Sequence, residues 1–394
     1  MSERFEGNFT QQEPIPEDAI AAAVAIMRSG RLHRYNTAPD EAGEVALLEQ
    51  EFATFTGAKY CLAVASGGYA LGCALRALGV APDEPVLTNA FTLAPVPGAI
   101  AALGARPVFV ETCENLTIEF ADLAAKAKAS GARVLMLSHM RGHLCDMDAL
   151  MEIARAHDLR VIEDCAHTMG AEWAGVPSGR HGVIGCYSTQ TYKHINSGEG
   201  GLIVSDDPEL AARMILLSGS YMMYPRHLAA PAPEVFEALK YDTPNVSGRM
   251  DNLRAAILRP QLGDLPERVK RWNVLYRAME AALTGAPGVA LSARAQAESY
   301  VGSSFQFRLP GRDSAKMMDL VARCGARGVE LKWFGAGEPA GFTSRHDSWR
   351  YAQAQDMPKT DAVLATLLDL RLPLTFSEAD AAQIARIIRD EVTR

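Results

Sequence analysis

Lys193 stands in a sequence context that favours chemistry. The segment CYSTQTYKHINSGEGGLIVSDD, residues Cys186–Asp207, places it between an apolar strand and a tight glycine turn that leads into a second apolar run. A lysine that forms a Schiff base must lose its proton readily, and burial lowers a lysine pKa because it disfavours the charged form. Tyr192 and Ile195 argue against full exposure of Lys193. The alternative is an exposed loop lysine, as most lysines are.

A carboxylate pair follows another predicted strand. In RVIEDCAHTMGA, residues Arg160–Ala171, the apolar Val161-Ile162 predicts a buried strand with Asp164 at its carboxyl end. A carboxylate in this position could hold the N–H of a pyridinium ring, which then accepts electrons from a substrate carbanion. The alternative is that Asp164 caps the amino end of a helix.

A glycine-rich turn offers an anion site. In VASGGYALGCAL, residues Val64–Leu75, a strand ends in Ser66-Gly67-Gly68 and a helix begins at once. Free backbone N–H groups and the helix dipole attract anions there, and glycine lets the backbone approach a phosphate closely. Because short glycine patterns are weak evidence, an ordinary strand-to-helix turn remains the alternative.

The elements that would position these residues alternate along residues 59–205. Short runs rich in Val, Ile and Leu suit strands buried on both faces, and helical stretches between the first five imply right-handed crossovers in an α/β sheet. Ligands in such folds bind at the carboxyl ends of the strands. The predicted strands are Tyr60–Ala65, Pro85–Thr88, Pro107–Val110, Val134–Leu137, Arg160–Glu163, Val183–Ser188 and Leu202–Ser205, and the predicted helices are Ala70–Leu78, Pro95–Leu103, Ile118–Ala129 and Asp148–Ala156.

The last third of the chain has a different pattern of predicted strands and helices. A long helical pattern covers Met250–Leu283, and Pro260 is expected to kink or break it. After about Gly285, short strands and helices suggest a smaller α+β domain. Its predicted elements are a strand at Ser304–Leu309, helices at Ser314–Cys324 and Ser377–Val392, and an irregular stretch at Lys332–Trp349.

Charge and cysteine content limit the classes of partner and the cellular compartment that we expect for this protein. The 394 residues carry a net charge of −8, which favours neither nucleic acid nor an anionic membrane. The polar N-terminal segment resembles no targeting signal, and no apolar run reaches transmembrane length. The seven cysteines are scattered without metal-finger spacing, so we expect reduced, mostly buried thiols, no metal and a cytoplasmic protein.

Six motifs in order resemble those of the DegT–DnrJ–StrS family of pyridoxal-5′-phosphate (PLP) dependent sugar aminotransferases. The resemblance is good from about Glu51 to Leu262 and loose beyond. It implies an α/β fold of type I, like aspartate aminotransferase, with a mostly parallel central sheet in a large domain at residues 42–281. Residues 1–41 and 282–394 would form a small α+β domain. The motifs are Ser66-Gly67-Gly68, Thr88–Leu93, His139–Asp148, Glu163–Gly170, Ser188–Gly201 and Arg249-Met250.

The resemblance also implies roles for individual residues. Lys193 would carry the cofactor as a Schiff base and move the proton, and Asp164 would pair with the pyridine nitrogen. His167 would lie against the cofactor, and Ser188 with the Gly67 and Gly68 amides would bind its phosphate. A packed histidine and a strand hydroxyl bonded to backbone are the alternatives for His167 and Ser188. His139 is expected to shape a loop and receives no chemistry.

The chain departs from the family pattern at three cofactor-binding positions. Gly68 replaces a threonine that contacts phosphate, Leu93 replaces an aromatic that stacks on the ring, and Ser247 replaces an asparagine that reaches the neighbouring subunit's phosphate. We expect Tyr69 or Phe91 to fill the vacated space, with neutral drift as the alternative. These departures question the family's usual nucleotide-sugar substrate.

The implied activity is transfer of an amino group from a small donor, glutamate or glutamine, to a keto or aldehyde group. The acceptor would be a keto-sugar or a cyclitol ketone. A small amine or amino acid substrate, a lyase or dehydratase on the same cofactor, and a non-catalytic sensor are the alternatives, and Lys193 counts against the last two. The active form would be a homodimer with shared active sites, and the segment 219–246 is the expected substrate loop.

Overall fold

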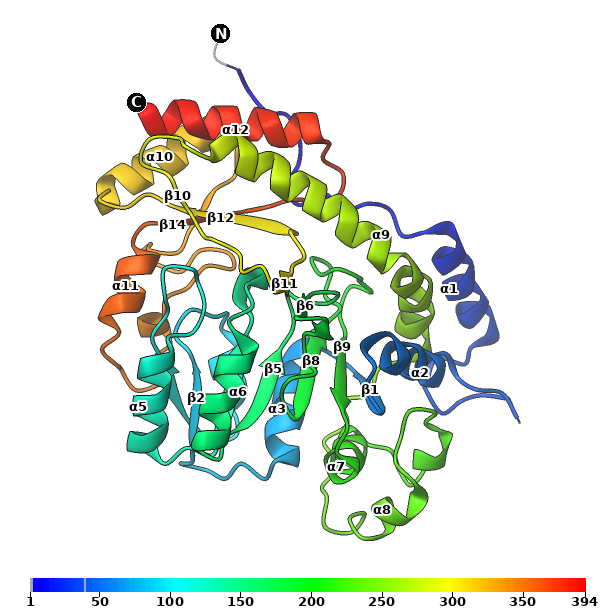
Figure 1. Cartoon of the computed structure of the whole chain (residues 1–394). Coiled ribbons are helices and arrows are strands. Elements are labelled where there is room, and N and C mark those ends of the chain that lie inside the picture. The colour runs from blue at the N-terminus through cyan, green and yellow to red at the C-terminus, as the bar shows by residue number, and fades with distance from the viewer. Residues whose placement is uncertain (1–2, 39) are drawn as a thin grey trace.

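A seven-stranded sheet forms the centre of the molecule (Figure 1). The computed structural model describes residues 3–38 and 40–394. The strand order is β1-β9-β8-β5-β4-β2-β3, and four of its six pairings are parallel. Only β9 runs against its neighbours, so the predicted mostly parallel α/β sheet is confirmed. The strands are β1 (Tyr60–Val64), β2 (Pro85–Asn89), β3 (Arg106–Val110), β4 (Val134–Ser138), β5 (Arg160–Asp164), β8 (Ile184–Ser188) and β9 (Gly201–Ser205).

Every predicted strand of this sheet is present, because the runs are apolar enough to be buried on both faces. Along β4, Val134 and Met136 face one helix layer, whereas Leu135 and Leu137 face the other. The first layer contains α3 (Gly67–Ala77), α4 (Pro95–Ala101) and α7 (Pro208–Ser218). The second contains α2 (Glu44–Thr56), α5 (Phe120–Ser130) and α6 (Met147–Ala156).

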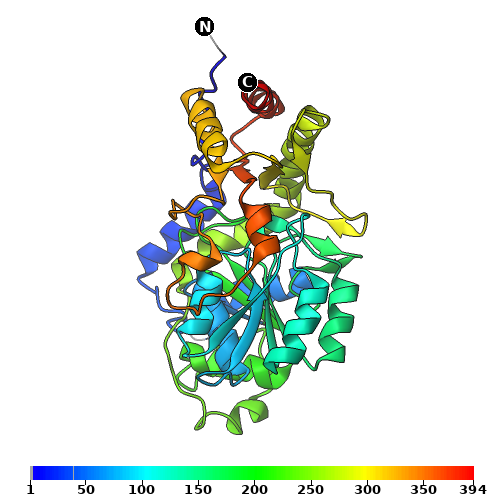
Figure 2. The same cartoon turned by 90° about the vertical axis from the view of Figure 1, so that its left-hand side faces the viewer.

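The carboxyl-terminal third of the chain forms a smaller antiparallel sheet. Its order is β10-β12-β14-β13, and α10 (Ser314–Ala326) and α12 (Glu378–Thr393) cover one face of it. Figure 2 shows these two helices, in orange and dark red, at the end of the molecule that carries the carboxyl terminus. The proposed domain boundaries stay a prediction. The strands are β10 (Ala290–Leu291), β12 (Ser304–Arg308), β13 (Lys332–Trp333) and β14 (Leu367–Arg371), and a third small sheet contains β11 (Glu298–Ser299), β6 (Glu172–Trp173) and β7 (Val176–Pro177).

The long helix α9 (Asn252–Leu283) joins the two sheets. It packs on α1 (Glu17–Ser29) and α2 near its start and on α12 near its end. The helix is continuous through Pro260 and Pro266, so Pro260 does not break it, and the alternative of a kink at Pro260 stays a prediction. Proline removes one backbone hydrogen bond and strains the preceding turn. Packing on both sides of α9 outweighs this local cost.

A buried charge network attaches the N-terminal segment to the large sheet. The Glu49 carboxylate on α2 accepts hydrogen bonds from Arg34 Nη1 at 2.8 Å and from the Ala63 amide of β1 at 2.8 Å. His227 Nδ1 lies 3.1 Å from the same carboxylate. Burial raises the pKa of Glu49, but the charges and hydrogen bonds of Arg34 and His227 outweigh it and lower that pKa to about 2. The network therefore joins three distant parts of the chain through one carboxylate.

The helices and the cysteines bear on two predictions made from composition, the absence of membrane spans and the burial of the thiols. Among the helices of residues 3–38 and 40–394, none combines the length and apolar character needed to cross a bilayer. All seven cysteines lie within the described residues as free thiols, and six of them are buried, with Cys113 partly exposed. The expected burial of most thiols is therefore confirmed, and their reduced state stays a prediction.

We predict that Glu49→Gln lowers the free energy of unfolding by about 3–5 kcal/mol, the usual cost of removing one partner from a buried ion pair. Urea titration followed by circular dichroism measures the change. Because the pKa of Glu49 is lowered from 4.5 to about 2, its contribution is fully present above pH 4.5 and is lost as the pH falls towards 2. The variant should therefore lose less stability than the wild type across this interval.

Glu51→Gln is the matched control, because Glu51 lies on the same helix. It pairs with Arg259, but its side chain is 40% exposed. Exposed ion pairs contribute at most about 1 kcal/mol. Equal losses for the two variants would contradict the special role assigned to Glu49.

Candidate active site

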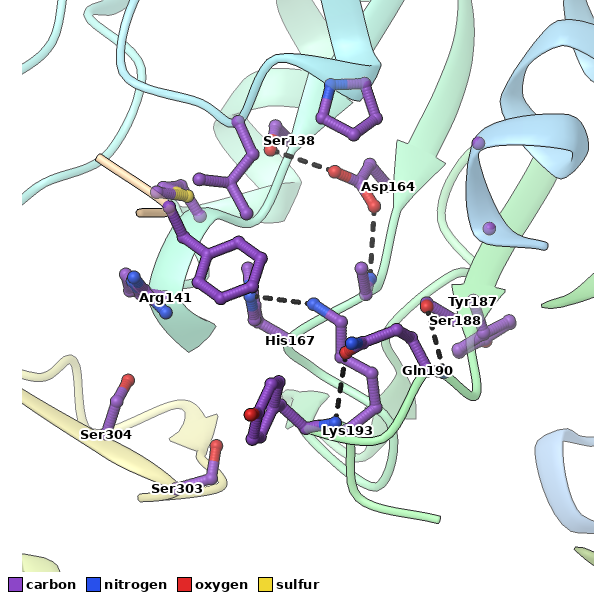
Figure 3. Close-up of a pocket in the computed structure, with 18 of the residues that line it drawn as sticks. Ser138, Arg141, Asp164, His167, Tyr187, Ser188, Gln190, Lys193, Ser303 and Ser304 are labelled. Atoms are coloured by element: carbon purple, nitrogen blue, oxygen red, sulfur yellow. Dashed lines mark hydrogen bonds between the residues drawn. The ribbon is translucent and has the colours of Figure 1, made fainter. Parts of the chain in front are cut away.

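A cavity of about 450 Å³ opens where the carboxyl ends of the large-sheet strands meet the small sheet. The turns after β1, β4, β5 and β8 line one part of it, and Ser303 and Ser304 approach from β12 (Figure 3). Of the sequence-predicted site residues, the cavity brings together Gly67, Gly68, Leu93, Asp164, His167, Ser188 and Lys193.

Lys193 lies five residues beyond the end of β8 and points its amine into the cavity (Figure 3). Its Nζ is 2.9 Å from His167 Nε2. The pKa of the Lys193 amine is lowered to about 7. Burial is the main cause, Asp164 opposes it, and the charges of Arg141 and Arg371 act in the same direction as burial. The prediction of an unexposed lysine that loses its proton readily is consistent with this environment.

His167 is the hydrogen-bond partner of that amine. Burial lowers the pKa of His167 well below its usual range, and the charges of Lys193 and Arg141 act in the same direction. The imidazole is therefore neutral at pH 7, and its Nε2 can accept a hydrogen bond from the Lys193 amine. His167 is thus more than a packed core histidine.

Asp164 ends strand β5 directly beside Ser138, its partner in register on β4. Its Oδ2 accepts a hydrogen bond from Ser138 Oγ at 3.1 Å, and its Oδ1 accepts one from the Ala166 amide at 3.1 Å. Burial raises the pKa of Asp164, while these bonds and the Lys193 charge lower it in part. The carboxylate is thus desolvated in a place where a cation would stabilise it. Asp164 bonds to a turn amide and caps no helix.

The predicted phosphate turn lies at the first turn of α3, whose N-cap is Ser66. The amides of a helix's first turn have no acceptor within the helix, so those of Gly67 and Gly68 are available to an anion. A Cβ atom on Gly67 would lie 2.8 Å from Ser188 Cβ, so glycine is required for these two residues to adjoin. The Ser188 hydroxyl accepts only a long hydrogen bond from the Gln190 amide, at 3.3 Å. An anion could therefore contact both residues at once.

The three departures from the family pattern have different outcomes. A Cβ on Gly68 would meet nothing closer than 3.9 Å, so the vacated space is open. Leu93 lines the cavity as predicted. Tyr69 bonds to the Leu217 carbonyl and Phe91 packs edge-on against Phe334. Neither is among the described residues that line the cavity, so the expectation that they fill the space is wrong.

Ser247 does not line this cavity. It is exposed, with a positive φ of 58°, in the segment beside β1, where the Ala65 amide donates to the Gly248 carbonyl at 2.8 Å. The cavity wall also includes no residue from the expected substrate loop 219–246, within the part of the chain that the structure describes. The contact of Ser247 with a neighbouring subunit and the substrate role of the loop stay predictions.

His139 and Glu163 form a buried pair outside the cavity lining, with His139 Nε2 2.9 Å from Glu163 Oε2. Together with Cys165 their ligand atoms lie within 4.8 Å of one another. The Glu163 carboxylate, however, already accepts hydrogen bonds from His139 and from the amides of Gly179, His181 and Gly182. The cluster therefore anchors the loop after β7 (Val176–Pro177), in keeping with the structural role predicted for His139.

Sequence reasoning missed several residues of the cavity wall. Ser138 ends β4, so the rule that ligands bind at strand carboxyl ends would have found it. Arg141 belongs to the His139–Asp148 motif but was given no role. Arg371 ends β14, a strand that was not predicted, so the sequence offered no signal for it.

The architecture and the cavity place the chain among the aminotransferases of fold type I. The crystal structure of 3-amino-5-hydroxybenzoic acid synthase superposes with a TM-score of 0.83 and 26% identity, covering 98% of this chain and 99% of that one. The chain belongs to the DegT/DnrJ/EryC1/StrS aminotransferase family, whose profile matches residues 15–389. The predicted family is therefore confirmed.

Two further relatives are equally similar to this chain in sequence but have different names. A dTDP-3-amino-3,4,6-trideoxy-alpha-D-glucose transaminase of Streptomyces venezuelae is 32% identical over 321 residues, 81% of this chain and 78% of that protein. A pleiotropic regulatory protein of Geobacillus stearothermophilus is 32% identical over 313 residues, 77% of each chain.

The family implies PLP, and the cavity fits that group. The Lys193 amine, whose pKa is lowered, suits the aldehyde of PLP. The desolvated Asp164 carboxylate suits the protonated nitrogen of the PLP ring. Free helix amides beside Ser188 suit a phosphate.

We predict that Gly67→Ala weakens PLP binding at least about tenfold, because the added methyl group must displace Ser188 from the phosphate turn. Titration of the apoprotein with PLP, followed by absorbance, measures the dissociation constant.

Gly68→Ala is the matched control, since it adds the same methyl group one residue later, where there is open space. Its affinity for PLP should stay close to that of the wild type. Equal weakening in both variants would show that contact with Ser188 is not the cause.

Proposed function

We propose that this aminotransferase uses PLP to move an amino group from glutamate or glutamine to a keto or aldehyde group of a sugar-like or cyclitol acceptor. The observation that carries the proposal is the Lys193 amine, with a pKa near 7, in the same cavity as the Asp164 carboxylate. Two similar proteins support the acceptor class, since one is a sugar transaminase and the other is a 3-amino-5-hydroxybenzoic acid synthase.

Asp164 would hold the ring nitrogen and keep it protonated. When bound, PLP withdraws electrons from the substrate carbon that bears the amino group. The hydrogen bond from Ser138 Oγ, which itself accepts from Thr92 Oγ1 at 2.8 Å, orients the Asp164 carboxylate. Asp164 lines the cavity in this orientation.

The opposite end of the cofactor would be held by the first turn of α3. The Gly67 and Gly68 amides and the Ser188 hydroxyl would bind its phosphate, and Leu93 would cover one face of the ring. His167 would lie against the ring and accept a hydrogen bond from the Lys193 amine.

Lys193 would act once in each half of the reaction. With the donor bound it would take the proton from the carbon that bears the amino group, and with the acceptor bound it would give a proton to the carbon that receives the amino group. An amine with a pKa near 7 can take up a proton at Nζ and give it back at the same pH, which suits a group that acts as base and then as acid. Burial supplies this property, because the surrounding cavity disfavours the ammonium form.

A non-catalytic regulator is the second candidate, because one relative is named as a regulatory protein. The intact set of Lys193, Asp164 and Ser188 favours catalysis instead. An absorbance spectrum recorded with and without glutamate separates the two, since only an aminotransferase converts its cofactor to the amine form.

A homodimer with shared active sites is the proposed assembly, and the cytoplasm is the proposed location. Exposed apolar side chains gather on one segment, which includes Tyr221, Met222, Tyr241 and Val246 and leads to Ser247. A C2 partner would cover this surface and bring Ser247 to the other cavity. The free cysteines support a reducing compartment.

We predict that borohydride reduction attaches PLP to Lys193 and that Lys193→Ala abolishes both labelling and turnover. Peptide mapping by mass spectrometry locates the label. Since only the neutral amine attacks the aldehyde, the rate of PLP attachment to the apoprotein should rise up to pH about 7 and level off above it.

Lys332 is a suitable control, because burial lowers its pKa to about 8. Lys332→Ala should keep the label on the Lys193 peptide. A label on Lys332 in the wild type would overturn the assignment of Lys193.

We predict that the protein has twice its chain mass of 42.5 kDa in solution, measured by multi-angle light scattering. Tyr241→Asp, which places a charge on an 85% exposed ring, should shift it towards monomer. Met318→Asp changes an apolar side chain, 58% exposed, on α10 and should leave the mass unchanged. A fully active monomeric wild type would refute the shared active sites.

A further inference from the structure

The loop that carries Lys193 is buried on one side of the lysine only. Tyr192 and Lys193 line the cavity, whereas residues 194–196 are buried in the protein. No helix or strand occurs in residues 189–200, which run from the end of β8 to the start of β9. The position of the Lys193 backbone therefore depends on the contacts that hold residues 194–196.

One side chain of α9 binds both backbone groups of Asn196. Gln261 Oε1 accepts a hydrogen bond from the Asn196 amide at 3.1 Å, and Gln261 Nε2 donates one to the Asn196 carbonyl at 2.8 Å. The same Nε2 donates to the Ile257 carbonyl, one turn earlier in α9, at 2.8 Å. Gln261 is fully buried. Because buried backbone groups without a partner are costly, these bonds fix the loop to the helix.

A second contact attaches the loop to the small-sheet side. His194 Nε2 lies 3.1 Å from Ser303 Oγ, and the His194 ring packs edge-on against Trp272 of α9, with 5.2 Å between ring centres. Burial lowers the pKa of His194 to about 3, so this imidazole is neutral. Lys193 is thus followed directly by a residue that contacts the small-sheet wall and, two residues later, by one that is fixed to α9.

Asn273 makes the same kind of two-bond contact farther along α9. Its Nδ2 donates to the Tyr300 carbonyl at 2.8 Å, and its Oδ1 accepts from the Gly302 amide at 2.8 Å. That segment leads into Ser303, on the opposite wall of the cavity. Because a helix rises ~1.5 Å per residue, the contacts of Gln261 and Asn273 lie about 18 Å apart along α9. Only the contact of Gln261 holds the loop of Lys193.

We propose that Gln261 is a positioning residue that keeps the Lys193 amine inside the cavity by fixing the Asn196 backbone to α9. The inference rests on the proposed role of Lys193. Gln261 is not among the described residues that line the cavity, so it acts through the loop and not on a substrate. A loop released from α9 would let water reach the amine, and the ammonium form would regain hydration.

Gln261 carries no charge, which makes its effect on the amine separable from electrostatics. Replacing it with another uncharged side chain removes none of the charged or titratable groups around Lys193. A change in the titration of the amine then reports a change in its burial. Those groups are Asp164 at the end of β5, His167 after β5, Arg141 after β4, Arg371 at the end of β14, and Tyr192 and His194 on the same loop.

Competitive labelling of the full-length apoprotein with acetic anhydride measures the titration of Lys193, because only the neutral amine reacts. Peptide mass spectrometry reads the label at each pH. The wild-type amine should titrate near pH 7. Gln261→Met keeps the length of the side chain without its amide, and it should move the midpoint upward by at least about one pH unit, towards the ordinary lysine value.

PLP attachment to the apoprotein gives a second readout of the same amine. With the midpoint raised by about one unit, the neutral fraction of Lys193 at pH 7 falls about fivefold, and the rate of attachment should fall with it. Gln261→Asn has an amide that is too short to reach both groups of Asn196, so it should shift the titration in the same direction. It is the deciding variant if Gln261→Met fails to fold.

Asn273→Leu is the matched control, because it removes a two-bond backbone contact from the same helix without touching the loop of Lys193. Like Gln261→Met, it should lower the urea concentration at which half of the protein is unfolded. The Lys193 amine should still titrate near pH 7. An equal upward shift in Asn273→Leu would overturn the specific role of Gln261, because general loosening of α9 would then be the cause.

A Lys193 midpoint that stays at the wild-type value in the folded Gln261 variants would also overturn the inference, as would a wild-type midpoint near the ordinary lysine value. Failure of the proposed function looks different. In that case the Gln261 variants shift the titration as expected, but the PLP-loaded wild type converts its cofactor with neither glutamate nor glutamine.

Discussion

Desolvation of the Lys193 amine is the constraint on which the rest of the cavity depends. An ammonium group at this position loses its hydration, and burial lowers its pKa from 10.5 to about 7. The residue that contacts the amine is compatible with its low pKa. His167, also buried, is neutral and can accept a hydrogen bond from the amine without adding charge.

The strand ends supply this environment together. Because β1, β4, β5 and β8 point the same way, their carboxyl ends place the phosphate turn, Ser138, Asp164 and Ser188 at one edge of the sheet. The reversed strand β9 makes the edge compact. Its first residue, Gly201, pairs with both Val64 and Ser188, and a Cβ there would lie 2.5 Å from the Ser66 carbonyl.

The cavity is electrically asymmetric as a result. Asp164 gives the large-sheet side a carboxylate, whereas Arg141 and Arg371 make the side near the small sheet positive. The positive side draws on both sheets, because Arg141 follows β4 of the large sheet and Arg371 ends β14 of the small sheet.

Local signals predicted much of this arrangement. The apolar runs that became β1 to β5, β8 and β9 are long enough to mark buried strands, and the residues just after them formed the cavity. Prediction failed where distant parts of the chain decide the outcome. The chain stays helical at Pro260 because α1, α2 and α12 pack along α9. Tyr69 and Phe91 turned to partners at Leu217 and Phe334 instead of the cavity.

The sequence by itself determined the class of fold, because apolar periodicity and strand-end position are local properties. The phosphate turn and the roles of Lys193 and Asp164, which follow from a resemblance to a family, stay predictions. Only the tertiary structure decided how strongly the amine is desolvated and that Arg371 meets Arg141 across two sheets. Burial and charge balance depend on every neighbour in space, and residues 230 positions apart in the chain leave no joint trace in a single sequence.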